Sequence, residues 1–176
     1  MKQYTQGGYQ EYEEQQIQET EKLEGVRKLE GVRILVADDN ELNLEIMFEI
    51  LNSSGAEVDC VHNGKEALDT YLKSSQGYYQ IILMDVHMPE MDGLEAAKRI
   101  RSCKGRPDGE TVPIIAMTAN VFAEDIAKTH GAGMDAHLIK PIDLDQVCRA
   151  LHKLVRKEKK DEEYGNKNKT ENSDRR

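Results

Sequence analysis

Short apolar runs alternate with segments of helical spacing through the middle of the chain. The runs lie at residues 34–37, 58–61, 81–84, 114–117 and 136–139. They are too short for helices and continuously apolar, as strands buried on both faces of a sheet must be, so we expect five strands. The segments between and after them repeat apolar residues every three or four positions, which predicts helices around 46–51, 67–72, 94–100, 121–127 and 144–155. Strict alternation predicts a parallel sheet with right-handed crossovers and helices on both faces.

The two ends of the 176-residue chain predict appendages and not a second domain. Residues 1–31 are rich in Glu and Gln and contain the hexapeptide KLEGVR at 22–27, which is repeated at 28–33. Each copy has a glycine that costs a helix about 1 kcal/mol relative to alanine, so we expect a polar linker that is partly helical or disordered. Residues 156–176 have the composition of a charged, disordered tail. The folded domain is therefore predicted to span 32–155.

The composition and charge of the chain argue against several classes of protein. The chain has 33 acidic and 24 basic residues and a formal net charge of -9, which argues against binding to nucleic acid. It has no apolar stretch of about 18 residues and no secretory signal, so we expect a cytoplasmic protein without a membrane segment. Cys60, Cys103 and Cys148 match neither a disulfide framework nor a metal-binding spacing, and we expect buried thiols.

Reactive side chains follow four of the predicted strands. They are Asp38 and Asp39 after the first, Asp85 after the third, Thr118 after the fourth and Lys140 after the fifth. Ligands of parallel sheets bind at the carboxyl ends of the strands. Three carboxylates at that edge repel one another, so they either take up protons or hold a hard cation such as Mg²⁺. The alternative, that Asp38 and Asp39 only cap the next helix, explains neither Asp85 nor Lys140.

The segments that carry these residues are ILVADDN at 34–40, IILMDVHMPEMDGLEAAKRIR at 81–101, PIIAMTAN at 113–120 and HLIKPID at 137–143. Together they resemble the receiver domain of bacterial-type response regulators. MDVHMPEMDG, MTANVFAED and MDAHLIKPID further resemble the receivers at the C-terminal end of hybrid sensor histidine kinases. The resemblance implies a flavodoxin-like, doubly wound, five-stranded parallel sheet in a three-layer α/β/α arrangement.

The resemblance also implies a role for each matching residue. Asp85 resembles the aspartate that accepts a phosphoryl group from phosphohistidine. Asp39, Asp85 and the main-chain carbonyl of His87 would bind Mg²⁺, with Asp38 acting through a coordinated water. Thr118 resembles the switch hydroxyl, and Lys140 the ammonium partner of the acyl phosphate.

Two further positions concern conformation. The Lys140–Pro141 bond resembles a cis peptide of the family. His137 stands where many receivers carry a Tyr or Phe that turns inward on phosphorylation. This departure leaves two outcomes open, a histidine that rotates or an output that depends on Thr118 alone.

The predicted function is that of a phosphoacceptor in a two-component phosphorelay, which switches conformation for protein–protein signalling. Its expected partner is a sensor histidine kinase or a histidine phosphotransfer protein. We expect a monomer or weak dimer that catalyses only its own phosphorylation and dephosphorylation, and so not an enzyme. One alternative is a Mg²⁺-dependent phosphatase with an aspartate nucleophile, although its DxDxT motif is absent from residues 38–41. The other is an adaptor of the same fold that works without phosphorylation.

The first helix offers a candidate docking surface for that partner. We expect its sheet-facing stripe to comprise Ile46, Met47, Ile50 and Leu51. Leu44 and Phe48 lie beyond this stripe, so at least part of the pair should be exposed beside the acidic edge. The alternative is that both side chains cover the fifth helix.

Overall fold

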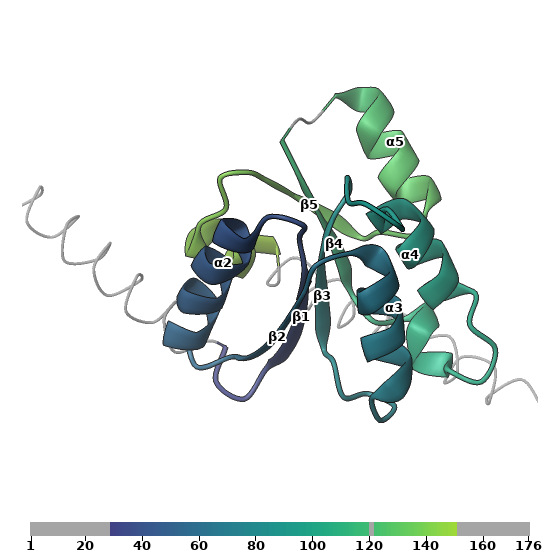
Figure 1. Cartoon of the computed structure of the whole chain (residues 1–176), viewed down its shortest axis with the longest axis horizontal. Helices are drawn as coiled ribbons and strands as arrows, with labels where there is room; N and C mark the ends of the chain where they lie inside the picture. Colours follow the sequence, from purple (N-terminus) through teal and green to yellow (C-terminus); the bar gives the residue numbers. More distant parts are fainter. Residues whose placement is uncertain (1–28, 120–121, 151–176) are drawn as a thin grey trace, which may run out of the picture.

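A parallel sheet of five strands forms the centre of the domain (Figure 1). The computed structural model describes residues 29–119 and 122–150. Within them the strands are β1 (Arg33–Ala37), β2 (Glu57–Val61), β3 (Ile81–Asp85), β4 (Ile114–Thr118) and β5 (Ala136–Ile139). Their order across the sheet is β2-β1-β3-β4-β5, and every pairing is parallel. The predicted doubly wound sheet and its five strands are confirmed.

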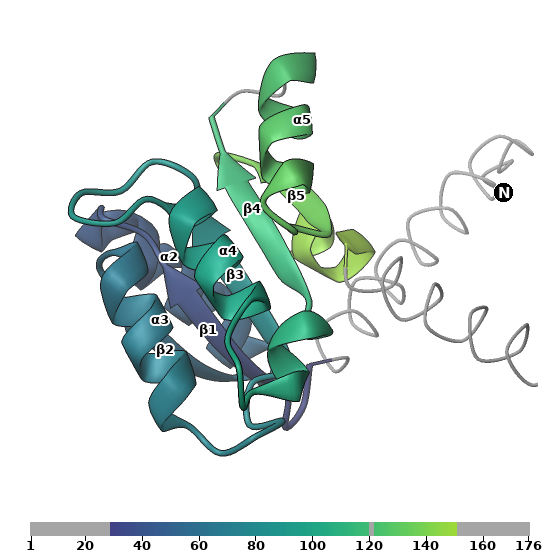
Figure 2. The same cartoon turned by 90° about the vertical axis from the view of Figure 1, so that its right-hand side faces the viewer.

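Helices cover both faces of this sheet (Figures 1 and 2). They are α2 (Glu41–Ser53), α3 (Gly64–Lys73), α4 (Gly93–Arg101) and α5 (Ala123–Gly131), with a short 3₁₀ turn η1 (Pro107–Glu110) before β4. Residues 144–150 are also helical. The last helical segment shares one apolar cluster with α2, while α3 and α4 share the other cluster on the opposite face. The predicted three-layer α/β/α architecture is therefore present.

The strands differ in burial according to their place in the sheet. All residues of β3 and β4 are buried, as expected for strands covered on both faces. Edge strand β2 instead exposes Glu57 and Asp59, while Val58 and Cys60 are half-buried. The described part of the core is thus concentrated on the central strands. Of the reactive residues, only Lys140 follows an edge strand, β5.

Helix α2 is turned differently from our expectation. Its buried residues are Leu44, Met47 and Leu51, which follow a spacing of three and four. Leu44 is only 3% exposed and lies within this stripe, not beyond it as we expected, so Phe48 alone supplies the predicted exposed part of the pair. Ile46 is 45% exposed and does not belong to the sheet-facing stripe, whereas Phe48 is 39% exposed. The stripe passes through Leu44 because this residue packs into the cluster of β1 and the last helical segment.

The packed domain reaches further toward the N-terminus than residue 32. Leu29 is 3% exposed within the α2 cluster, and the Gly31 N–H donates to the Gly55 carbonyl at 3.0 Å. Residues 1–28 and 151–176 lie outside the described residues, so the linker and the tail stay predictions. The same holds for Val121, Leu151 and Val155 of the predicted helices.

The three cysteines are half-buried, not fully buried as we expected. Cys60 illustrates the reason, because it lies on edge strand β2, which is covered less than the central strands. Burial nevertheless raises the pKa of the Cys60 thiol, and the charges of Asp59 and Glu41 act in the same direction.

Candidate functional site

Three carboxylates meet at the carboxyl edge of the sheet. Asp38 and Asp39 directly follow β1, and Asp85 is the last residue of the neighbouring strand β3. One carboxylate oxygen from each residue lies within 4.8 Å of the others. Asp38 is 1% exposed and Asp85 6%, whereas Asp39 is exposed to solvent. The predicted convergence of these side chains is therefore observed.

The helix that follows Asp39 is capped by another residue. Asn40 is the N-cap of α2, and its Oδ1 accepts hydrogen bonds from the N–H groups of Leu42 (3.0 Å) and Asn43 (3.4 Å). The Asp38 Oδ1 instead accepts the Asn40 N–H at 3.0 Å. The alternative that the aspartates serve only as caps is thus wrong, and the carboxylates are left to face the edge of the sheet.

Lys140 places a positive charge between two of the carboxylates. Its Nζ lies 2.6 Å from Asp38 Oδ2 and 2.5 Å from Asp85 Oδ2. The main-chain N–H of Lys140 donates to the main-chain carbonyl of Thr118 at 2.9 Å. This hydrogen bond joins the end of β5 to the end of β4. The Lys140–Pro141 peptide bond is cis, as predicted.

Burial and charge oppose each other in this group. Burial raises the pKa of Asp85, and the charge of Asp38 adds to this effect, while Lys140 and the His87 N–H act against it. Burial disfavours the charged form of Lys140, but hydrogen bonds and charges from Asp38 and Asp85 outweigh it and raise the pKa of the ammonium. The lysine therefore stays charged and offsets part of the repulsion between the two buried carboxylates.

Backbone contacts fix the position of Asp85. The His87 N–H lies 3.3 Å from Asp85 Oδ1, while the His87 side chain is exposed. Gly93, the first residue of α4, packs directly against the end of β3. A Cβ atom at Gly93 would lie 2.0 Å from the Asp85 main-chain oxygen, so a larger residue there would displace the strand end.

Thr118 and His137 lie on the neighbouring strands β4 and β5. Thr118 ends β4 and is 7% exposed. His137 is half-buried, and its Nε2 makes a close contact with the hydroxyl of Thr129 on α5. Burial lowers the pKa of His137, and the nearby charge of His130 lowers it further. His137 therefore lies against α5 as a group that favours its neutral form.

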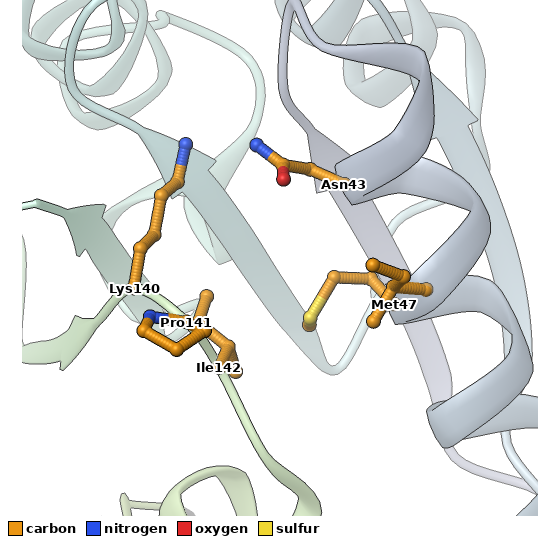
Figure 3. Close-up of a pocket in the computed structure, with 6 residues that line it drawn as sticks. Asn43, Met47, Lys140, Pro141 and Ile142 are labelled. Carbon is orange, nitrogen blue, oxygen red and sulfur yellow. The ribbon is translucent and has the colours of Figure 1, made fainter.

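Sequence reasoning missed Asn43, which contacts the buried end of the acidic group. Its Nδ2 donates to Asp38 Oδ1 at 3.0 Å. Figure 3 shows its side chain extending from α2 toward Lys140, beside a small cavity. This cavity of about 60 Å³ is also lined by Ile46, Met47, Pro141 and Ile142. The available signal was its position three residues after the N-cap, which places Asn43 on the first turn of the helix.

The chain matches the family described as the response regulator receiver domain over residues 34–152, well over half of its length. It belongs to this family. The match includes every residue of the acidic group, Thr118, His137 and Lys140. Receivers are domains of signalling proteins and have a flavodoxin-like fold. The architecture of this chain agrees with the assignment.

Curated relatives of this receiver include histidine kinases. The hybrid signal transduction histidine kinase L of Dictyostelium discoideum is 40% identical over 120 residues, which are 68% of this chain and 7% of that protein. The sensor histidine kinase RcsC of Escherichia coli is 36% identical over 118 residues, which are 67% of this chain and 12% of that protein. The chain therefore spans only a small part of the length of these relatives.

Solved receivers share the fold of this chain. The receiver of the sensor histidine kinase PA1611 from Pseudomonas aeruginosa has a magnesium ion coordinated in its active-site cleft. It is 34% identical with a TM-score of 0.63, covering 71% of this chain and 98% of that chain. The receiver of the Arabidopsis thaliana histidine kinase CKI1, complexed with Mg²⁺ and BeF₃⁻, is 31% identical with a TM-score of 0.64 and covers 76% and 95%.

The acidic group of this receiver fits the same type of ion. Its three close carboxylates offer the hard oxygen donors that Mg²⁺ prefers.

Among residues 29–119 and 122–150, no helix has both the length and the apolar character needed to cross a membrane.

Proposed function

We propose that this receiver accepts a phosphoryl group from phosphohistidine onto Asp85 in a Mg²⁺-dependent reaction. The observation that carries the proposal is the position of the Asp85 carboxylate. It is buried at the edge of the sheet, 2.5 Å from Lys140 Nζ and within reach of the other two carboxylates. A buried carboxylate that lies between a lysine ammonium and a group of cation-binding carboxylates is suited to attack on phosphorus.

The residues that would hold Mg²⁺ are Asp39, Asp85 and the main-chain carbonyl of His87, with Asp38 contributing through a water. When bound, the ion offsets the negative charge of the carboxylates and of the phosphoryl oxygens. The neighbouring Lys140 supplies a second positive charge, which its two ion pairs already direct toward Asp85.

In the proposed transfer an Asp85 carboxylate oxygen attacks the phosphorus atom of the donor. A P–O bond to Asp85 forms while the P–N bond to the donor imidazole breaks, and the imidazole nitrogen keeps the electron pair of that bond. The transferring group carries negative charge on three equatorial oxygens, so positioning and positive charge are the main requirements. Lys140 meets the second requirement by moving from Asp38 and Asp85 toward a phosphoryl oxygen.

The conformational output is assigned to the β4 and β5 side of the site. Thr118 lies at the end of β4, next to the strand that ends in Asp85, where its hydroxyl can turn toward a phosphoryl oxygen. His137 contacts Thr129, so a shift of α5 would change the environment of its imidazole. We assign Thr118 as the primary switch and His137 as the residue that couples β5 to α5.

The proposed donor is a sensor histidine kinase or a histidine phosphotransfer protein, and the output is signalling through protein contact in a two-component phosphorelay. In this function the receiver is a phosphoacceptor that is itself modified, and it turns over no separate substrate. The similarity to hybrid histidine kinases favours donors of this class.

Acetyl phosphate tests the proposal without a partner protein. The full chain should gain the mass of one phosphoryl group in Mg²⁺ and none in excess EDTA, as measured by intact-protein mass spectrometry. The Asp85→Asn variant should gain none. Asp92→Asn is the matched control, since Asp92 is an exposed aspartate that caps α4 and asparagine caps equally well. Equal labelling of Asp85→Asn and the wild type would contradict the assignment.

A further inference from the structure

The buried carboxylate of Asp38 has hydrogen-bond donors on one oxygen and an ion-pair partner on the other. Oδ1 accepts the Asn40 N–H and the Asn43 amide, each at 3.0 Å. Oδ2 lies 2.6 Å from Lys140 Nζ. A carboxylate that is only 1% exposed needs such partners, because burial without them is costly. Asn43 is thus one of three groups that set the orientation of Asp38.

These three groups differ in how firmly they are held. The Asn40 N–H belongs to the backbone, and Asn43 stands on the first turn of α2, whose N-cap accepts the Asn43 N–H. The ammonium group of Lys140 lies at the end of a flexible side chain and pairs with Asp85 as well as with Asp38. Under the proposed function Lys140 must leave Asp38 when it turns to the phosphoryl group. The contacts of Oδ1 then have to orient Asp38 on their own.

We propose that Asn43 is a positioning residue that holds the Asp38 carboxylate in the orientation in which it would bind a water of the bound Mg²⁺, so that this orientation does not depend on Lys140. The inference rests on the proposed function, since it concerns the same cation site. Because an ionised carboxylate only accepts hydrogen bonds, the Nδ2 group of Asn43 must face Asp38. A hydrogen bond from a rigid helix fixes the direction of the Asp38 carboxylate, and removal of outer-shell partners of a metal site commonly changes metal affinity about 10–100-fold.

Calorimetric titration of the full chain with Mg²⁺ tests the inference. Asn43→Ala and the nearly isosteric Asn43→Leu should each bind Mg²⁺ about tenfold more weakly than the wild type. Asn52→Ala is the matched control, because Asn52 is an exposed asparagine near the far end of the same helix. Its affinity should equal that of the wild type. Two variants of different size guard against a defect that is specific to one side chain.

A double-mutant cycle separates positioning from a general structural effect. If Asn43 acts through Asp38, then Asn43→Ala should weaken Mg²⁺ binding less than about twofold in the Asp38→Ala background. Labelling by acetyl phosphate should separate an effect on Mg²⁺ binding from an effect on the labelling rate. Asn43→Ala should raise the Mg²⁺ concentration for half-maximal labelling about tenfold, with a rate at saturating Mg²⁺ close to that of the wild type.

The outcomes distinguish this inference from the proposed function. Wild-type affinity in both Asn43 variants overturns the inference alone, and so does a tenfold loss that persists in the Asp38→Ala background. A wild-type chain that binds no Mg²⁺ overturns the proposed function together with the inference. A loss of affinity that disappears in the Asp38→Ala background supports the positioning role.

Discussion

Helices α2 and α5 follow strands that end in site residues, but they are packed very differently. α2 buries three large apolar side chains, Leu44, Met47 and Leu51, against the sheet. Thr129 is the one buried residue of α5, while its N-cap Phe122 is 65% exposed and Ile126 is 40% exposed. In Figures 1 and 2 the upper end of α5 stands clear of the other helices. Each buried Leu or Met contributes about 1.5–3 kcal/mol, so α2 is held much more strongly.

Under the proposed function, this difference in packing corresponds to a division of tasks. The α2 side carries Asp38 and Asn43, which must keep a fixed geometry if a cation and a phosphoryl group are to be bound. The α5 side carries Thr129, whose contact with His137 is polar and local. An element with few buried apolar contacts needs little free energy to move. Under the proposed function, the α2 side therefore keeps the geometry of the site fixed, while the weakly packed α5 side moves in response to phosphorylation.

Removal of Lys140 should have the largest effect on the fixed side. Lys140→Met leaves Asp38 and Asp85 buried and close together with no positive charge between them. We expect the free energy of unfolding in EDTA to fall by about 4 kcal/mol, with part of the loss recovered in Mg²⁺. Urea unfolding measures both values. Lys65→Met, at an exposed surface pair, is the control and should change stability little. An unchanged stability of Lys140→Met in EDTA would show that the carboxylates do not repel one another.

Truncations in the two helices compare their packing directly. Leu44→Ala should destabilise the domain by about 3 kcal/mol, because it opens a cavity beneath α2. Ile126→Ala should cost less than about 1 kcal/mol, because this side chain on α5 is substantially exposed. Thermal unfolding of the two variants with the wild type gives the difference. Similar losses at both positions would mean that the helices are packed equally well.

His137 provides a smaller, pH-dependent effect on the α5 side. The pKa of His137 lies below its ordinary value of about 6.5, mainly because burial disfavours the charged form. At a pH between the lowered pKa of His137 in the folded domain and its ordinary pKa of about 6.5, the unfolded chain binds more protons than the folded domain. The His137 contribution to stability is therefore complete above about pH 6.5 and decreases as the pH falls toward the lowered pKa.

Urea unfolding between pH 5 and pH 8 in EDTA checks this direction. His137→Gln removes the titrating group and should flatten that part of the pH dependence. His87→Gln is the control, since the His87 side chain is exposed. The prediction is wrong if His137→Gln and the wild type lose stability in parallel below pH 6.5. His130, which lowers the pKa of His137, is the other titrating group that acts on it.

The sequence was most informative where one physical requirement dominates. Strands buried on both faces must be continuously apolar, so β3 and β4 could be predicted within one residue. The acidic group could also be predicted, because parallel strands bring their carboxyl ends to one edge. Both predictions depend on the sheet topology and not on details of side-chain packing.

The sequence did not show how individual side chains pack against one another. Every face of α2 carries apolar residues, so the pattern did not show whether Leu44 or Ile46 faces the sheet. The contact of Asn43 with Asp38 depends on the rotation of that helix and was missed for the same reason. The contact between His137 and Thr129 joins two elements whose relative position only the folded structure provides.

The most direct test of the division of tasks is a comparison of ¹H–¹⁵N spectra of the full chain before and after phosphorylation by acetyl phosphate in Mg²⁺. Intact mass confirms labelling in the wild type and in Thr118→Ala. We predict that wild-type shift changes away from the acidic edge are concentrated in α5 and β5, residues 123–139, with small changes along the buried face of α2. In Thr118→Ala the label should be present but the α5 changes much reduced. Equal changes in α2 and α5, or wild-type shifts in labelled Thr118→Ala, would contradict the account.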